Sequence, residues 1–322
     1  MPASEKIPFG PLRAFPRLKP GQQVALISPS SHQGRPEPGL LPQAVDILTG
    51  WGLQVAPLPQ PEPRHLYLAG DDAWRAAQFQ DAYLDPALAA LFIARGGYGA
   101  SRMLPLLQAD KLAQAAPKAV VGFSDATALF AYLHSQVGVQ TLHGPCLAAP
   151  GALESPQREQ SLQALRQVLF APEHRPTYVL QRLGGTWPTQ PATEVEGRLL
   201  GGCLSVFQTT LGTPWEPDTQ GAILFLEDVG EAPYRVDRML THLAQAGKFR
   251  GLKALVLGHL ARCDSEPPGL LEQVLRDVLG QRPFPVAWQL AAGHGDPNLA
   301  LPLGGMARLR LEAGSQGVLE II

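Results

Sequence analysis

The chain has 322 residues, of which 45% are hydrophobic, and its formal net charge is −2 at pH 7. This length and apolar content are sufficient for two domains with substantial cores. Because the charge is near zero and no basic stripe is interleaved with aromatic residues, we expect no nucleic-acid partner.

Cysteine usage and hydropathy set further limits. Cys146, Cys203 and Cys263 are widely spaced and odd in number, so they predict neither a disulfide framework nor a C-x-x-C metal motif. The sequence contains no run of about 20 apolar residues, so we expect no membrane span. The Pro-rich segment 1–20 lacks the apolar core of a secretory signal, which favours a cytoplasmic protein.

The first half of the chain alternates between strand and helix patterns. Apolar runs typical of buried strands and segments with helical spacing occur in turn at 24–27, 40–50, 53–58, 75–84, 88–94, 119–123 and 125–134. Strands that alternate with helices predict a parallel, doubly wound sheet.

A glycine-rich segment, Arg95-Gly96-Gly97-Tyr98-Gly99, follows the expected strand at 88–94. Three glycines in four residues can turn backbone N–H groups toward a ligand oxygen. The spacing matches neither a Walker nor a dinucleotide fingerprint, although phosphate cradling stays an alternative. Paired with the N–H of Asp125, an N–H of this segment can complete an oxyanion hole.

Ser124 lies between an expected strand and an expected helix. The string GFSD differs from G-x-S-x-G, but a sharp strand-to-helix turn is the geometry of a nucleophile elbow. The alternative is an ordinary Ser/Asp helix N-cap.

A serine nucleophile needs a base and an orienting carboxylate. The apolar run 222–226 ends in Glu227-Asp228, and His294 lies between Gly293 and Gly295, where a thin backbone allows close approach. Each residue alone could be a strand-end charge or a turn histidine. The joint order Ser, Glu, His favours a catalytic set.

Composition changes between residues 149 and 197, where Pro, Gly and Thr are frequent. This change predicts a domain boundary. We therefore expect an N-terminal domain at 1–170 that carries the nucleophile, a linker at 171–195, and a C-terminal domain at 196–322 that carries Glu227 and His294.

Six segments occur together in a recognisable order: RGGYGASRMLP, VGFSDAT, LHGP, GRLLGG, LFLEDVGEAPYRVDRML and GHGDPNLALPLG. From about residue 21 to 311 the chain resembles the LD-carboxypeptidase family of serine peptidases, the muramoyl-tetrapeptide carboxypeptidases. The resemblance implies an α/β fold, with a flavodoxin-like parallel-sheet domain, a smaller C-terminal α/β domain and an active site between them.

The resemblance also implies site roles. Ser124 is the expected nucleophile, Glu227 the orienting acid and His294 the base, with the N–H groups of Gly97 and Asp125 as the oxyanion hole. No cofactor or metal is expected. A metal hydrolase built on His143, Asp125 and His294 is an alternative in principle, but no compact ligand spacing supports it. His143 is otherwise given no role.

The expected activity is release of a C-terminal D-amino acid, D-Ala above all, from a wall-derived murein tetrapeptide in cell-wall recycling. Relatives imply a homodimer. Two alternatives remain. The first is a microcin C immunity-type peptidase that acts on peptidyl or aminoacyl nucleotides, with Trp187 stacking on the base unless it is only a hydrophobic plug. The second is a non-catalytic ligand-binding module in the same cleft.

Recognition of the substrate is harder to assign. A planar guanidinium suits a terminal carboxylate, and Arg235 is predicted ahead of Arg102 because it follows the Glu227 strand. Tyr98 is also expected at the substrate. The family usually has Asn after the paired glycines of GRLLGG, whereas this chain has Cys203. That departure leaves the fine specificity open.

Overall fold

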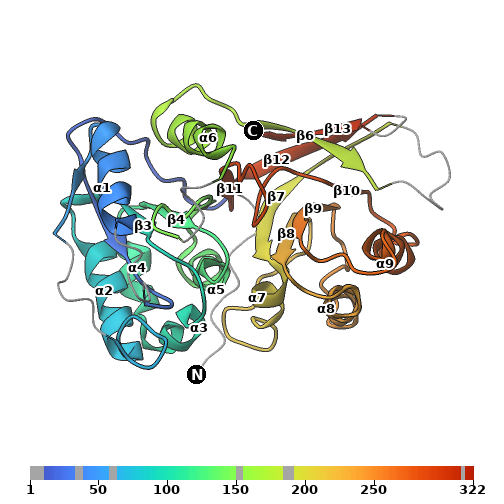
Figure 1. Cartoon of the computed structure of the whole chain (residues 1–322), viewed down its shortest axis with the longest axis horizontal. Coiled ribbons are helices and arrows are strands. Elements are labelled where there is room, and N and C mark those ends of the chain that lie inside the picture. Colours follow the sequence, from blue (N-terminus) through green and yellow to red (C-terminus); the bar gives the residue numbers. More distant parts are fainter. Residues whose placement is uncertain (1–10, 33–38, 58–63, 150–154, 184–191, 313–315) are drawn as a thin grey trace.

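The computed structural model describes residues 11–32, 39–57, 64–149, 155–183, 192–312 and 316–322. They form an open sheet and a closed barrel that lie side by side (Figure 1). The sheet has the order β11-β5-β4-β3-β1-β2, with β1 to β5 parallel and β11 antiparallel to β5. Its strands are β1 (Gln23–Ile27), β2 (Gln54–Val55), β3 (Leu88–Ile93), β4 (Ala119–Gly122), β5 (Thr141–His143) and β11 (Leu301–Leu303).

Helices cover both faces of this sheet, so its strands are continuous apolar runs. They are α1 (Leu40–Gly50), α2 (Asp72–Leu84), α3 (Ala100–Met103), η1 (Leu104–Leu106), α4 (Ala109–Gln114), α5 (Ala126–Tyr132), the π-helical η2 (Leu133–Val137) and α6 (Arg158–Phe170). Alternate residues of β1 face opposite ways: Leu26 packs in the cluster of α1 and α6, and Ile27 in that of α2 and α5. The strand order confirms the predicted flavodoxin-like sheet.

The second unit is a closed barrel with the order β10-β6-β13-β12-β7-β8-β9. Its strands are β6 (Thr177–Arg182), β7 (Thr193–Cys203), β8 (Ala222–Val229), β9 (Ala254–Ala261), β10 (Val286–Trp288), β12 (Met306–Leu311) and β13 (Gln316–Ile321). Helices α7 (Leu204–Gln208), α8 (Pro233–Gln245) and α9 (Leu270–Leu279) pack outside β8 and β9 through a separate apolar cluster. Strands β7 to β10 are parallel.

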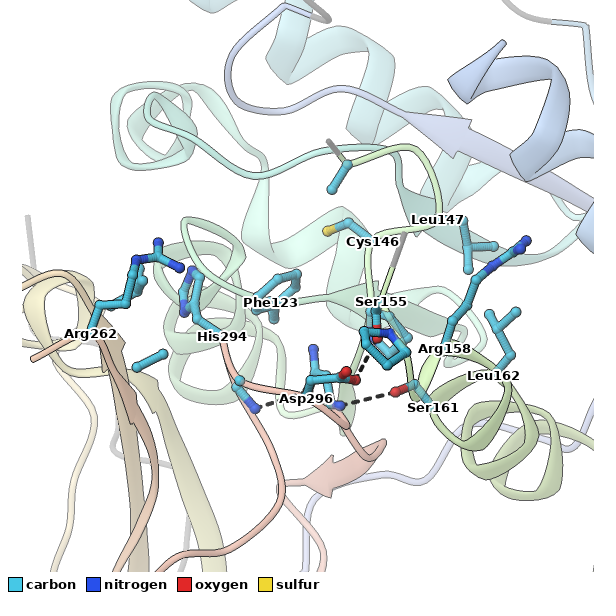
Figure 2. Close-up of a pocket in the computed structure, with 18 of the residues that line it drawn as sticks. Phe123, Cys146, Leu147, Ser155, Arg158, Ser161, Leu162, Arg262, His294 and Asp296 are labelled. Carbon is cyan, nitrogen blue, oxygen red and sulfur yellow. Dashed lines mark hydrogen bonds between the residues drawn. The ribbon is translucent and has the colours of Figure 1, made fainter. Parts of the chain in front are cut away.

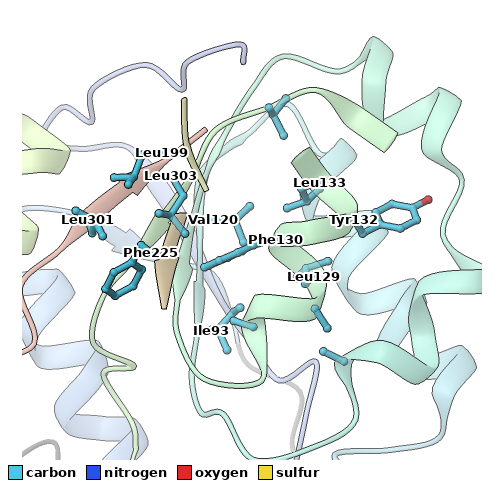
Figure 3. Close-up of a cluster of buried hydrophobic side chains, with 14 of the residues drawn as sticks. Ile93, Val120, Leu129, Phe130, Tyr132, Leu133, Leu199, Phe225, Leu301 and Leu303 are labelled. Atoms are coloured by element: carbon cyan, nitrogen blue, oxygen red, sulfur yellow. The ribbon is translucent and has the colours of Figure 1, made fainter. Parts of the chain in front are cut away.

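The two units share one apolar cluster. Figure 3 shows Leu129 and Phe130 of α5 on one side and Phe225 of β8 with Leu301 and Leu303 of β11 on the other. This common core places the carboxyl ends of β3, β4 and β5 beside the barrel, which confirms a site between the units.

A hydrogen bond joins the start of α5 to the end of β7. The Cys203 N–H donates to Thr127 Oγ1 at 3.0 Å. A Cβ on Gly202 would lie 2.4 Å from the same oxygen, so this approach requires glycine. The predicted domain limits stay a prediction. Strand β6 lies within 171–195, and β11, from the C-terminal segment, belongs to the first sheet.

Candidate active site

Ser124 lies on the turn between β4 and α5, with a φ of +63°. Positive φ is uncommon for a residue with a side chain, and it is typical of strained functional turns. A Cβ on Gly96 would lie only 3.0 Å from Ser124 Cβ, so the glycine-rich segment passes directly over this turn. No side-chain hydrogen bond caps α5, which means that the Ser124 hydroxyl is not used as a helix cap.

The Asp125 carboxylate ties three loops together beneath this turn. It is buried, and its Oδ2 accepts hydrogen bonds from Ser30 Oγ at 2.6 Å and from the Ala100 N–H at 2.8 Å. Burial raises the pKa of Asp125, and these two donors and Arg75 offset only part of that rise. The side chain therefore has a structural part, separate from its backbone N–H.

Arg75 fixes the glycine-rich segment from below. Its buried guanidinium donates to the carbonyl oxygens of Gly99 at 2.6 Å and Pro29 at 2.5 Å. Gly97 has a φ of +114°, and a Cβ there would lie 2.3 Å from Ser31 Oγ. Within the described ranges, neither the Gly97 nor the Asp125 amide N–H donates to a protein acceptor. Both amides are therefore available to a ligand oxygen.

Glu227 and His294 form a tight pair. Glu227, near the end of β8, is fully buried, and its Oε2 lies 2.7 Å from His294 Nδ1. The same oxygen accepts the backbone N–H of His294 at 3.0 Å. Burial raises the pKa of Glu227, but the facing His143 and His294 outweigh it and lower the value to about 2. The carboxylate is therefore ionised and orients the imidazole.

The glycines on either side of His294 permit this packing. A Cβ on Gly293 would lie 2.4 Å from Glu227 Oε2, and one on Gly295 would lie 2.2 Å from the His259 ring. The predicted thin backbone around His294 is thus confirmed.

The histidine loop is anchored on the first unit. Asn298 accepts the Gly293 N–H at 2.9 Å and donates its own N–H to Ser161 Oγ at 3.0 Å. Asp296 accepts hydrogen bonds from Ser155 Oγ and from the Gln157 N–H at the start of α6. These contacts hold the loop against α6.

Phe123, the residue before Ser124, connects the β4–α5 turn with His294. The Phe123 ring packs on the His294 ring with centroids 4.8 Å apart. No hydrogen bond joins Ser124 Oγ to the His294 ring among the residues that the structure describes. The nucleophile–base hydrogen bond is often loose in the absence of substrate.

A cavity of about 560 Å³ opens beside His294 and Phe123 (Figure 2). Its walls come from both units, including α6 and the ends of β8 and β9. Arg262 lies on the His294 side of the cavity, and Arg158 lies across it with Leu162. A cavity of this size holds a short peptide segment.

Of the predicted substrate-binding residues that the structure describes, neither Arg235 nor Tyr98 lines this cavity. Arg235 is in the first turn of α8, exposed and 3.5 Å from Glu231, and it is not among the residues that line this cavity. Tyr98 is half exposed next to the oxyanion loop and packs against Tyr67. Arg102 binds Asp72 at 2.9 Å. Trp187 lies outside the described residues, so its role stays a prediction.

Sequence reasoning missed Arg75, Arg158 and Arg262 in this region, and it gave no role to His143. A signal existed for Arg75, because it shares the buried face of α2 with Phe79 and Tyr83 at helical spacing. Arg158 begins α6 and Arg262 directly follows β9, and neither residue lies in a motif that pointed to the site.

Cys203 is buried at the end of β7, in register with Glu227 on β8. Burial and the nearby Glu227 raise the pKa of its thiol. The described residues contain no cluster of three or more His, Cys, Asp or Glu with metal-binding geometry.

Comparisons with known proteins identify the family of the chain. The LD-carboxypeptidase N-terminal domain matches residues 24–144, and the LD-carboxypeptidase C-terminal domain matches residues 196–309. The murein tetrapeptide carboxypeptidase of Pseudomonas aeruginosa is 34% identical over 258 residues, covering 77% of this chain and 81% of that protein. The chain belongs to the LD-carboxypeptidase family.

Two further proteins are similar to this chain. The crystal structure of muramoyltetrapeptide carboxypeptidase from Oxalobacter formigenes superposes with a TM-score of 0.79 at 32% identity, covering 93% of this chain and 98% of that one. The microcin C7 self-immunity protein MccF of Escherichia coli is 27% identical over 265 residues, which cover 74% of this chain and 76% of that protein.

Proposed function

We propose that this protein is a serine carboxypeptidase that releases a C-terminal D-amino acid, D-Ala above all, from murein tetrapeptides during cell-wall recycling. The observation that carries this proposal is the 2.7 Å hydrogen bond between buried Glu227 and His294, at a cavity whose wall includes the residue before Ser124. Family membership supports the same chemistry. We place the enzyme in the cytoplasm and expect a homodimer; the described helices include none that is long and apolar enough to span a membrane.

The proposed reaction is acyl transfer in two steps. Ser124 Oγ attacks the scissile carbonyl while His294 takes its proton, and the oxyanion is stabilised by the N–H groups of Gly97 and Asp125. His294 then protonates the leaving amine of the D-residue. Water, deprotonated by His294, attacks the acyl-enzyme and releases the shortened peptide. Throughout, Glu227 stabilises the imidazolium and fixes its tautomer.

The cavity supports a polyanionic peptide as substrate. Wall tetrapeptides carry several carboxylates, and two arginines line the cavity. The Nε of Arg158 is buried without a hydrogen-bond partner among the described residues, which is costly unless a ligand accepts from it. We therefore add Arg158 and Arg262 to Arg235 as candidates for the carboxylate contact.

Paired substrates identify that contact. On a tetrapeptide with a free C-terminus, replacing the responsible arginine by Lys is expected to lower kcat/KM about 30-fold or more, equivalent to about 2 kcal/mol. On the C-terminal amide, which the wild type should cleave poorly, the same change should have little effect. Arg102→Lys is the matched control, because Arg102 is bound to Asp72. Equal cleavage of acid and amide by the wild type would contradict an exopeptidase.

Similarity to MccF supports a second candidate function, cleavage of peptidyl or aminoacyl nucleotides. A solved structure of MccF in complex with aspartyl sulfamoyl adenosine is 24% identical to this chain. Comparing kcat/KM for a murein tetrapeptide and for aspartyl sulfamoyl adenosine separates the two activities. We expect preference for the tetrapeptide. Turnover of either substrate excludes a non-catalytic binding module.

A further inference from the structure

Three polar atoms at the centre of the site are buried and have no hydrogen-bond partner among the residues that the structure describes: His143 Nδ1, His143 Nε2 and Glu227 Oε1. Leaving a buried donor or acceptor unpaired destabilises the folded protein. Two of these atoms face one another, because His143 Nε2 lies 3.7 Å from Glu227 Oε1. The surroundings of His143 and Glu227 indicate how these two unpaired atoms can satisfy one another.

The backbone and two aromatic rings fix the position of His143. It ends β5, in register with Gly122 of β4 on one side and with Leu301 of β11 on the other. Its ring meets the rings of Phe225 at 5.1 Å and Phe123 at 5.9 Å, both edge to face. The imidazole is therefore held in an apolar cage, with no exposed surface.

The two oxygens of Glu227 are used differently. Oε2 accepts hydrogen bonds from Nδ1 and from the backbone N–H of His294, whereas Oε1 lies 3.7 Å from His143 Nε2 and has no hydrogen-bond partner in the described part of the chain. A buried carboxylate requires hydrogen-bond donors around it. The 3.7 Å separation exceeds a hydrogen bond, and closing it to about 3 Å needs a movement of under about 1 Å.

We infer that His143 is a positioning residue for the proposed reaction: its Nε2–H donates to Glu227 Oε1 and holds the carboxylate in the plane that His294 requires. This inference rests on the proposed triad. No proton is transferred from His143, whose Nε2–H serves only as a hydrogen-bond donor. Glu227 then lies between two imidazoles, one that acts on the substrate and one that keeps the acid in place.

The choice of side chains tests this role. In His143→Gln the amide nitrogen takes the place of Nε2, so the donor is kept. In His143→Asn the amide reaches only the place of Nδ1, and in His143→Leu there is no donor. We expect kcat to fall about 10- to 100-fold in the Asn and Leu variants with KM nearly unchanged, and to stay within about threefold in the Gln variant. His134→Gln, at a buried histidine bonded to Thr141, is the control for disturbing the core.

A measurement without turnover tests the inference independently. Imidazole ¹⁵N–¹H correlation spectra should show His143 as the Nε2–H tautomer, with a proton resonance that shifts in Glu227→Gln. The Nδ1–H tautomer, an Nε2–H signal insensitive to Glu227→Gln, or equal loss of kcat in the Gln and Leu variants would overturn it. If tetrapeptide is not cleaved but the spectra show the coupling, the proposed substrate fails and the positioning contact stands.

Discussion

Asp125 and Glu227 are both buried carboxylates of the same site, yet their surroundings shift their pKa values in opposite directions. Asp125, on the sheet side, accepts from a hydroxyl and an amide, and burial raises its pKa. Glu227, on the barrel side, is also opposed by burial, but two imidazoles lower its pKa to about 2. Asp125 therefore serves as a hydrogen-bond acceptor between loops, whereas Glu227, paired with His294, stays ionised.

The largest effects should come from the reacting groups. Ser124→Ala and His294→Ala should each lower kcat by on the order of 10⁴-fold, and the double variant should lose little more, because members of a triad act as a unit. Steady-state kinetics on a tetrapeptide measure this. Losses that multiply in the double variant would contradict a shared triad.

Removing the charge at each carboxylate tests the comparison directly. Glu227→Gln should lower kcat by on the order of 10³-fold or more with KM nearly unchanged, because the imidazolium loses its stabilising charge. Asp125→Asn should retain activity within about tenfold, since one amide oxygen can accept both donors that Oδ2 accepts now. Similar losses in the two variants would mean that both carboxylates work as charges.

Asp228→Asn controls for the choice of acid. The Asp228 carboxylate accepts the N–H groups of Ser205 and Val229, away from His294. Its replacement should therefore lower stability more than kcat. Loss of kcat in Asp228→Asn, with Glu227→Gln still active, would mean that Asp228 and not Glu227 is the orienting acid.

Removing the hydrogen-bond acceptor at Asp125 tests whether its side chain stabilises the fold. Asp125→Ala leaves Ser30 Oγ and the Ala100 N–H without their partner and should cost about 1–3 kcal/mol of unfolding free energy. Chemical denaturation should rank wild type and Asn variant close together and the Ala variant well below. If Ala and Asn variants are equally stable, the carboxylate does not clamp these loops.

The smallest effect is a pair of opposite pH slopes. The folded-state pKa of Glu227 is lowered, so its stabilisation is present above about 4.5 and is lost as pH falls toward about 2. The pKa of Asp125 is raised, so its contribution is present at low pH and is lost as pH rises. For each residue, the quantity to measure is the unfolding free energy of the wild type minus that of the variant, Glu227→Gln or Asp125→Asn. As pH falls from about 5 to the acid limit of folding, this difference should decrease for Glu227 and increase for Asp125. Parallel changes would contradict the assigned shifts.

The sheet side of the site was the more predictable from sequence. The strand, the turn at Ser124 and the glycine-rich segment are local patterns, and the structure places all three as expected. The pairing of Glu227 with His294, 67 residues later, needed the family resemblance, because no local pattern joins residues so far apart.

Other features had no sequence signal strong enough to use. His143 was seen in its motif but given no role, since its importance comes from facing Glu227 across two units. Arg158 and Arg262 were missed because the cavity walls are assembled from separate loops. The limits of β6 and β11 depend on pairing partners that lie far away in the chain.

Strand β11 has a consequence for how the chain is made. It covers the edge of β5, and Leu301 follows its partner His143 by 158 residues. Until the C-terminal segment leaves the ribosome, β5 presents an unpaired edge of the kind that invites pairing with other chains. A shortened chain that ends before residue 301 would keep that edge permanently open. The edge of the first sheet is therefore closed only late in synthesis, when residues 301–303 pair with β5.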